Sequence, residues 1–285
     1  MFSFLIKNRF IKIKIFNFFR FIIKFTSPLL ACKLNNLRQK AMGRSIYFSY
    51  DKNKKLFCVK DESNIEVYFS EKVRGFDTYS YSIKYRAKTL AETYSLDKIR
   101  FNNNDVVIDC GANFGDIFIF FLLKNLKIQY VSFEPSPKEY SCLLLNCKNQ
   151  SNNNIGLSNR KGNYDFYLKS GSGDSSLIEP AGGFKKIIQV PTTTLDDFVQ
   201  EKNIKRIKFF KIEAEGAEPE VLEGSKNSLK IIDYIGVDGS RERGKKEEST
   251  IEFAKEFLQR NDFDLIKINE TDDFIKGLFK NKKNN

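Results

Sequence analysis

The stretch Val106–Gly115 constrains this chain more than any other. Its sequence, VVIDCGANFG, begins as an apolar run, reaches Asp109, and turns between Gly111 and Gly115. The almost wholly apolar run 117–123 follows it. This pattern predicts a buried strand, a tight turn and a buried helix. Because glycine readily adopts positive φ and has no side chain, a ligand can approach the backbone at such a turn.

The spacing of this turn separates two classes of nucleoside ligand. Dinucleotide-binding turns follow G-x-G-x-x-G and place helix amides against a pyrophosphate. Here the pattern is D-x-G-x-x-x-G, and Asp109 would repel a pyrophosphate. S-adenosylmethionine has no phosphate and carries ammonium and sulfonium charges, so the pattern favours this methyl donor. The alternative is a structural Asp109 that only ties down the turn amides.

A second carboxylate ends the next predicted strand, YVSFEP, 23 residues beyond Gly111. Glu134 is placed like the acid that accepts hydrogen bonds from the ribose hydroxyls in nucleoside-binding Rossmann-like sheets. Dehydrogenases share this acid. Glu134 therefore predicts a nucleoside without choosing between a methyl donor and NAD.

Positive charge is concentrated near the N-terminus. Residues 1–60 hold 14 of the 48 basic residues and one of the 36 acidic ones, which leaves 34 basic and 35 acidic residues in 61–285. The formal charge of +12 therefore does not belong to the sheet domain, and we expect no nucleic-acid partner. Five cysteines without C-x-x-C spacing and the lack of histidine argue against structural zinc and suit a reducing cytosol.

Residues 1–25 alternate aromatic and branched side chains with six basic residues. No uncharged run there approaches the ~18 residues that a spanning helix requires. We expect a cytoplasmic protein that is peripheral at the membrane, with residues 1–25 contacting an anionic surface. The alternative is a helix that docks on the domain and covers apolar surface.

Strands alternate with helices through most of the chain, which predicts an α/β fold with a mainly parallel sheet and helices on both faces. We expect a basic hydrophobic segment at 1–44, strands and a helix packing on the catalytic domain at 45–100, and the catalytic domain at 101–285. Strands are predicted at 106–109, 129–134, 154–158, 207–212 and 231–237, and a closing antiparallel hairpin at 263–279.

Four acids each end a predicted strand: Asp109, Glu134, Glu213 and Asp238. Ligands gather at the carboxyl ends of strands in open α/β sheets, so we expect these acids to converge on one edge. Glu215 lies at a helix start. Carboxylates favour such positions by ~0.3–1 kcal/mol without any catalytic role, which is the alternative reading of Glu215.

An ordered set of motifs resembles the FkbM-family methyltransferases over about residues 80–270. The motifs are DCGANFG at 109–115, FEP at 133–135, GLS at 156–158, TTLD at 193–196 and KIEAEGAE at 211–218. The resemblance implies a class I methyltransferase fold, which is a Rossmann-like seven-stranded sheet with a C-terminal antiparallel hairpin. It also implies S-adenosylmethionine as donor and usually O-methylation, often of sugars.

Carried over residue by residue, the resemblance implies a donor site. Its residues are Asp109, Gly111, Ala112, Asn113, Gly115, Glu134, Pro135 and Leu157. One departure concerns the family's lysine–hydrophobic–aspartate–valine–glutamate motif, in which Glu213 and Ala214 replace aspartate and valine. The charge survives but reaches one methylene further.

We therefore predict methyl transfer to a hydroxyl of a sugar or glycan precursor, with Glu213, Asp238 and Glu215 as catalytic residues. In-line displacement needs alignment and a proton acceptor. Without histidine the base is a carboxylate, a lysine or a metal-activated water, and we expect no metal. Glu213 and Asp238 are the preferred bases, ahead of Lys211. The rival readings are a Rossmann-type NAD-dependent enzyme and a non-catalytic, membrane-associated binding module.

Overall fold

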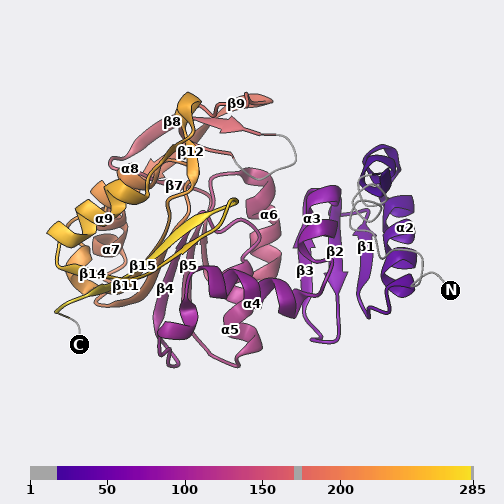
Figure 1. Cartoon of the computed structure of the whole chain (residues 1–285), viewed down its shortest axis with the longest axis horizontal. Coiled ribbons are helices and arrows are strands. Elements are labelled where there is room, and N and C mark those ends of the chain that lie inside the picture. The colour runs from indigo at the N-terminus through magenta and orange to yellow at the C-terminus, as the bar shows by residue number, and fades with distance from the viewer. Residues whose placement is uncertain (1–17, 170–174, 284–285) are drawn as a thin grey trace. The chain divides into compact units, whose positions relative to one another are not determined.

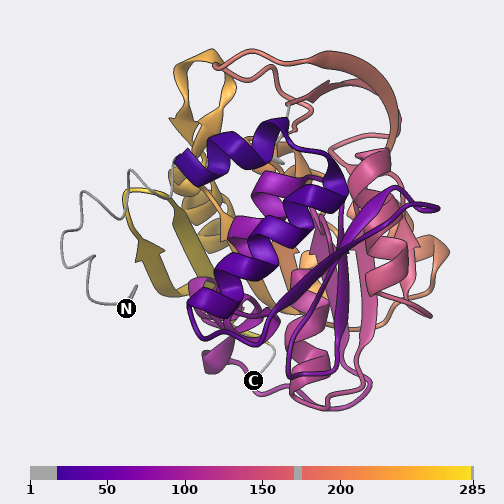
Figure 2. The same ribbon diagram turned by 90° about the vertical axis from the view of Figure 1, so that its right-hand side faces the viewer.

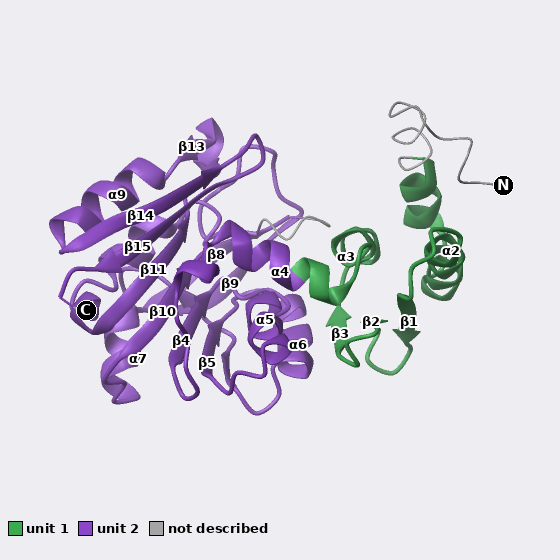
Figure 3. Ribbon diagram, turned by 60° about the horizontal axis from the view of Figure 1, so that its bottom comes forward, with its two compact units in different colours: residues 1–86 green, residues 87–285 purple. Residues whose placement is uncertain are grey.

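The computed structural model describes residues 18–169 and 175–283. The chain divides into two compact units, residues 1–86 and residues 87–285 (Figure 3). The predicted domain boundaries at residues 44 and 100 remain predictions.

The first unit combines helices with a small antiparallel sheet. Residues 18–25 are helical, and α2 (Pro28–Ala41) follows after a short break (Figure 2). Ser27 caps α2, because its hydroxyl oxygen accepts a hydrogen bond from the Leu30 amide, and Pro28 occupies the first turn. The sheet and the next helix are β1 (Tyr47–Asp51), β2 (Leu56–Lys60), β3 (Glu66–Phe69) and α3 (Lys72–Thr78).

The second unit is built around a seven-stranded sheet (Figure 1). In spatial order its strands are β14 (Phe263–Glu270), β15 (Ile275–Asn281), β11 (Ile232–Asp238), β10 (Ile207–Ile212), β4 (Val106–Cys110), β5 (Gln129–Phe133) and β6 (Ser151–Asn153). The run from β11 to β6 is parallel, whereas β15 is antiparallel to both of its neighbours. This order confirms the predicted Rossmann-like sheet with its C-terminal antiparallel hairpin.

Helices cover both faces of this sheet, as the sequence predicted. The alternation of side chains along β10 shows why. Phe209 and Phe210 are both fully buried, but Phe209 packs in the core beneath one set of helices and Phe210 in the core beneath the other. On the Phe209 side lie α4 (Ile83–Thr93), α5 (Asp116–Leu123) and α6 (Pro137–Asn146), and on the Phe210 side lie α7 (Leu195–Glu201), α8 (Glu218–Glu223) and α9 (Ile251–Arg260).

Two smaller sheets complete this unit. One contains β7 (Gly156–Leu157), β9 (Lys186–Thr193) and β8 (Gly162–Leu168), and the other pairs β12 (Arg241–Arg243) with β13 (Glu248–Ser249).

The prediction of a single strand of the main sheet at 154–158 was wrong. The main-sheet strand is β6, and Gly156–Leu157 pairs with β9 instead. The polar sequence of β6 concealed it. Its asparagines replace apolar packing with hydrogen bonds, such as that from Asn153 Nδ2 to the Ser132 carbonyl at 3.0 Å.

Candidate active site

The glycine turn after β4 lies against the end of β10. Gly111 has φ +73°, and a Cβ atom on it would lie 1.8 Å from the Glu213 carbonyl oxygen. Gly115 has φ +86°, and its Cβ would lie 2.3 Å from Cys147 Sγ. Both positions therefore require glycine for packing as well as for backbone conformation.

Asn113 and Glu134 join this turn to the end of β5. The Asn113 amide donates to Glu134 Oε2 at 2.8 Å, and the Ser136 amide donates to Oε1 at 2.9 Å. Burial raises the pKa of Glu134 to about 7, although these two amides oppose the increase. A carboxylate can accept more than two hydrogen bonds, so Glu134 holds the turn and keeps acceptor capacity for ligand hydroxyls.

The side-chain oxygen of Asn113 is buried and has no hydrogen-bond partner. Asn113 also has φ +50°, a conformation that asparagine tolerates better than most residues. A buried unpaired acceptor next to a ribose-type carboxylate suits a ligand that carries hydrogen-bond donors. These residues therefore fit a nucleoside ligand that donates hydrogen bonds.

A continuous chain of alternating charges crosses the carboxyl ends of β4, β10 and β11. Lys211 Nζ lies 2.8 Å from Asp109 Oδ1 and 2.9 Å from Glu213 Oε2. Lys276 Nζ lies 3.1 Å from Glu213 Oε1 and 2.8 Å from Asp238 Oδ2. Three carboxylates thus share two ammonium groups, so every charge in this buried chain has an opposite neighbour.

Asp109 is the most deeply buried member of the chain. Its side chain is completely covered, and both of its oxygens are in use, because Tyr130 donates its hydroxyl to Oδ2 at 2.5 Å. Lys211 also donates to the Gly111 carbonyl at 2.9 Å, which ties the acid to the turn. The structure therefore places Asp109 behind the turn. Its predicted direct contact with the donor stays a prediction.

Glu213 is the member of the chain that is open to a ligand. Its side chain is 27% exposed, whereas those of Lys276 and Asp238 are 7% and 5% exposed. Burial raises the pKa of Glu213, but Lys211 and Lys276 together outweigh burial and hold this pKa well below its ordinary value. Glu213 is therefore an ionised, fixed carboxylate at the surface of the site.

Asp238 is less available than Glu213. Its Oδ1 accepts hydrogen bonds from the amide and the hydroxyl of Ser240, and its Oδ2 faces Lys276. Burial raises the pKa of Asp238, and Lys276 opposes that increase. With both oxygens engaged, Asp238 is better placed to hold Lys276 than to take a proton from an acceptor.

The loop after β10 is closed by Glu218. This buried carboxylate accepts hydrogen bonds from the amides of Ala214, at 2.8 Å, and Gly216, at 3.2 Å, and from the Thr250 hydroxyl at 2.8 Å. Glu215 lies on the same loop with φ +51°, and its side chain is half-buried. The predicted catalytic role of Glu215 stays a prediction.

The other predicted donor residues occupy different environments. Ala112 and Leu157 are both buried, in the cores on opposite faces of the sheet. Pro135 is half-buried and lies beside Gly156. Their contacts with a donor stay predictions.

Sequence reasoning missed Lys276 and Tyr94. Lys276 lies on β15 opposite Asp238, outside every motif that we recognised. Lys276 donates a hydrogen bond to the Tyr94 hydroxyl oxygen at 3.2 Å, and its Nζ lies 4.3 Å from the centroid of the Tyr94 ring. The one available signal was a lysine inside the run FIKGLF at 274–279, whose other residues are apolar or glycine.

The pair Glu213 and Asp238 does not fit a divalent cation. Lys276 Nζ lies between the two carboxylates and would repel a second cation. In residues 18–169 and 175–283 no group of three or more acidic, cysteine or histidine side chains could hold a metal ion.

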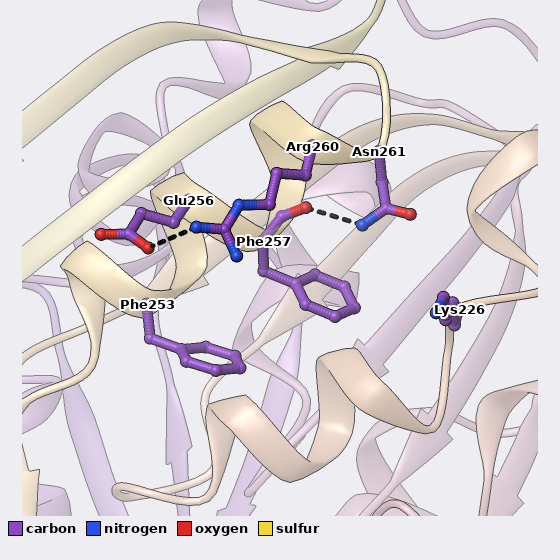
Figure 4. A pocket seen from close by; sticks show the side chains of 6 residues that line it. All are labelled: Lys226, Phe253, Glu256, Phe257, Arg260 and Asn261. Carbon is purple, nitrogen blue, oxygen red and sulfur yellow. Dashed lines mark hydrogen bonds and ion pairs between the residues drawn. The ribbon is translucent and has the colours of Figure 1, made fainter.

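Another pocket lies along α9 (Figure 4). The rings of Phe253 and Phe257 stack with centroids 5.8 Å apart, and Arg260 pairs with Glu256 at 3.2 Å. None of its lining residues belongs to the predicted site.

Together, the sheet, the glycine turn and the acid after β5 define a Rossmann-like nucleoside-binding enzyme. The chain belongs to the FkbM methyltransferase family, because the family described as "Methyltransferase FkbM domain" matches residues 109–265. This match confirms the family predicted from the sequence and, with it, the methyltransferase class and S-adenosylmethionine as donor.

Two relatives carry names that describe their activity. The 2-O-methyltransferase NoeI of Sinorhizobium fredii is 26% identical over 152 residues, which cover 46% of this chain and 61% of NoeI. The hexuronic acid methyltransferase AglP of Haloferax volcanii is 26% identical over 183 residues, which cover 61% of this chain and 70% of AglP. The chain thus matches less than two thirds of the length of NoeI.

Among solved structures, M. capricolum TrmK in complex with S-adenosyl-homocysteine has a TM-score of 0.40 and 15% identity. The similarity covers 70% of this chain and 68% of TrmK. At this level the similarity supports no conclusion about activity.

Proposed function

We propose that this protein transfers a methyl group from S-adenosylmethionine to a hydroxyl of a sugar or glycan precursor. The observation that carries the proposal is the position of Glu213. This ionised, partly exposed carboxylate follows β10, and its backbone abuts the donor turn at Gly111. The names of NoeI and AglP support a sugar-type acceptor.

The residues of the turn would hold the donor, which supplies an electrophilic methyl group when bound. Glu134 would accept hydrogen bonds from the ribose hydroxyls while it keeps its bonds to the turn. Gly111 has no side chain, so the donor could approach the backbone closely at this residue. Asn113 would offer its unpaired oxygen to a donor N–H or O–H group.

Glu213 would act as the proton acceptor. As the acceptor oxygen bonds to the methyl carbon and the carbon–sulfur bond breaks, the hydroxyl proton passes to the Glu213 carboxylate. A low pKa makes Glu213 a weak base towards a neutral alcohol. An oxygen that has gained a methyl group is strongly acidic, however, so a weak base suffices for late proton transfer. Fixed orientation by Lys211 and Lys276 would then supply alignment.

A polar pocket next to the acids would suit a polyhydroxylated acceptor. It begins two residues beyond Asp238 and combines hydroxyl, carboxylate and guanidinium groups, which match the donors and acceptors of a sugar. Its lining residues are Ser240, Arg241, Glu242, Glu270, Thr271, Asp272, Asp273, Phe274 and Ile275.

Labelled donor incubated with a panel of nucleotide sugars and glycans tests the proposal, with the product identified by mass. Glu213→Gln should lower turnover by ~10²–10⁴, while S-adenosylhomocysteine should bind as it does to the unchanged protein. Glu252→Gln, an exposed change on α9, is the control.

Methylation of nitrogen or sulfur acceptors alone would refute O-methylation. Full turnover in Glu213→Gln would remove Glu213 from the mechanism. A protein that binds donor but methylates nothing would favour the non-catalytic module.

A further inference from the structure

Residues 18–42 expose an unusual amount of apolar side chain. Phe25 is 71% exposed and Leu37 is 65% exposed. Phe18, Phe21 and Phe25 recur at helical spacing, so they lie on one face of the helical residues 18–25. Two adjacent segments of the first unit thus present large apolar groups to solvent, whereas single exposed apolar residues are ordinary on a protein surface.

The helix α2 buries polar side chains and exposes apolar ones. It buries Asn35 and Gln39, whose side-chain amide atoms have no hydrogen-bond partner, and it exposes Leu30 and Leu37. A helix that only packed on its own unit would bury leucines and expose amides, because burying an unpaired amide costs free energy. The outer face of α2 therefore combines exposed leucines with the exposed lysines Lys33 and Lys40.

The apolar groups are interspersed with positive charge. Residues 18–42 contain five basic residues and no acid. Lys24, Lys33 and Lys40 are exposed, and among the residues that the structure covers their ammonium groups form no ion pair. The lysine stems can lie along apolar surface while their charges reach outward.

We propose that residues 18–42 bind the surface of an anionic lipid bilayer. The phenylalanine and leucine side chains would enter the boundary between headgroups and acyl chains, and the lysines would contact anionic headgroups. In the part of the chain that is described, no helix is long and apolar enough to cross a membrane. The surface would therefore lie on the bilayer. Residues 1–17 of the predicted membrane-binding segment lie outside the described residues.

Charge complementarity favours lipid over a second copy of this chain. In a two-fold dimer the same patch faces itself, and lysines would then meet lysines with no acid in residues 18–42 to neutralise them. An anionic bilayer supplies both the apolar layer and the opposite charge. This inference goes beyond methyl transfer and does not depend on it.

Sedimentation of the full chain with lipid vesicles tests the inference. We expect binding to phosphatidylcholine vesicles that contain phosphatidylglycerol, weak binding to phosphatidylcholine alone, and loss of binding at high salt. The triple change Lys24→Gln, Lys33→Gln and Lys40→Gln should weaken binding roughly 100-fold, since each lysine near an anionic surface contributes a factor of about five. The triple change of Phe18, Phe21 and Phe25 to Ser should also abolish sedimentation.

The control variants use exposed residues of the second unit. Lys127→Gln, Lys148→Gln and Lys205→Gln remove the same charge, and Leu122→Ser, Leu144→Ser and Ile266→Ser remove three exposed apolar side chains. Donor affinity, measured by calorimetry, should be unchanged in every variant, and far-ultraviolet circular dichroism checks that the helices of the first unit are kept. Equal loss in the control variants, or equal binding to both kinds of vesicle, would overturn the proposal. A lipid-free dimer that dissociates in the phenylalanine variant would assign the patch to a second copy instead.

Discussion

Lys276 Nζ bridges two carboxylates at the ends of the neighbouring strands β11 and β10. It lies 2.8 Å from Asp238 Oδ2 and 3.1 Å from Glu213 Oε1. The antiparallel register makes this contact possible, because Lys276 is paired with Asp238 across β11 and β15. Burial lowers the pKa of Lys276, but the two carboxylates outweigh burial and raise that pKa above its ordinary value. Lys276 is therefore charged, and it fixes the charge and orientation of Glu213.

Lys276→Met should move the acid limb of the kcat/KM profile to higher pH. Removal of the ammonium group removes one of the two charges that hold the pKa of Glu213 down, so Glu213 will be protonated at a higher pH. The pH dependence of kcat/KM measures this shift. Lys276→Arg keeps the charge and should keep the limb closer to its original position.

Loss of one partner of a buried pair can itself destabilise a protein by about 3–5 kcal/mol. The double variant Lys276→Met with Asp238→Asn removes both charges and keeps the comparison possible if the single variant unfolds. Lys267→Met, on the exposed side of the adjacent strand β14, is the matched control. An acid limb that stays in place in both Lys276 variants would show that the lysine only supports the fold.

Glu134→Ala should weaken binding of S-adenosylhomocysteine by ~1.5–3 kcal/mol, which is the range for hydrogen bonds to a charged group. Binding to the unchanged protein should also weaken as the pH falls below about 7, because burial raises the pKa of Glu134 to about 7 and the protonated acid accepts fewer hydrogen bonds. Calorimetry from pH 6 to pH 8 measures both effects. Glu134→Gln should remove the pH dependence, and an unchanged slope in that variant would assign it to another group.

The sheet could be predicted because apolar runs and turn residues mark its parallel strands. Asp109, Glu134 and Glu213 were placed on one edge for the same reason, since each follows such a run. The strand β6 was misplaced because its residues SNN carry no apolar pattern. Local patterns report burial well, but they fail where hydrogen bonds replace packing.

The partners of the predicted acids could not be read from the chain in the same way. Lys276 lies 63 residues after Glu213, and only the register of β15 brings them together. A lysine in a strand normally predicts an exposed position. The state of Glu213, and the engagement of both oxygens of Asp109, therefore depend on long-range pairing that spacing does not reveal.

Chelation should leave methyl transfer unchanged. The space between Glu213 and Asp238, where a divalent ion would have to lie, contains the Lys276 ammonium group. Turnover is measured with labelled donor before and after treatment with EDTA, followed by removal of the chelator. Activity that is lost to EDTA and restored by magnesium would contradict the metal-free mechanism.

Gly111→Ala should be far more damaging than Gly183→Ala, although both glycines have φ +73°. An alanine Cβ at residue 111 would lie 1.8 Å from the Glu213 carbonyl oxygen, whereas nothing lies within 4 Å of the Cβ position at residue 183. Gly183→Ala should therefore cost only the ~1–2 kcal/mol of left-handed backbone strain. Thermal unfolding and donor calorimetry measure the two variants side by side. Equal losses of stability and donor affinity in the two variants would contradict the prediction. They would show that the backbone at Glu213 shifts to accommodate the alanine Cβ at no energetic cost.

Glu218→Gln should make the stability of the protein less dependent on pH. Burial raises the pKa of Glu218 from an ordinary value of 4.5 to about 7, so between these pH values the folded protein holds a proton that the unfolded chain has released. Stability from this group is fully present below about pH 4.5 and is lost as the pH rises through 7. The change across the window is up to about 3 kcal/mol.

Glutamine keeps the shape of Glu218 and an oxygen that can accept from the Ala214 and Gly216 amides, while its amide can donate to Thr250. Chemical denaturation at pH 5 and pH 8 measures the effect. The variant should gain stability relative to the unchanged protein at pH 8 and lose that advantage at pH 5. Glu134 has the same raised pKa, so the double variant Glu218→Gln with Glu134→Gln should flatten the profile further. A profile that is identical in the single variant and the unchanged protein would mean that Glu218 is ionised in the folded state throughout this range.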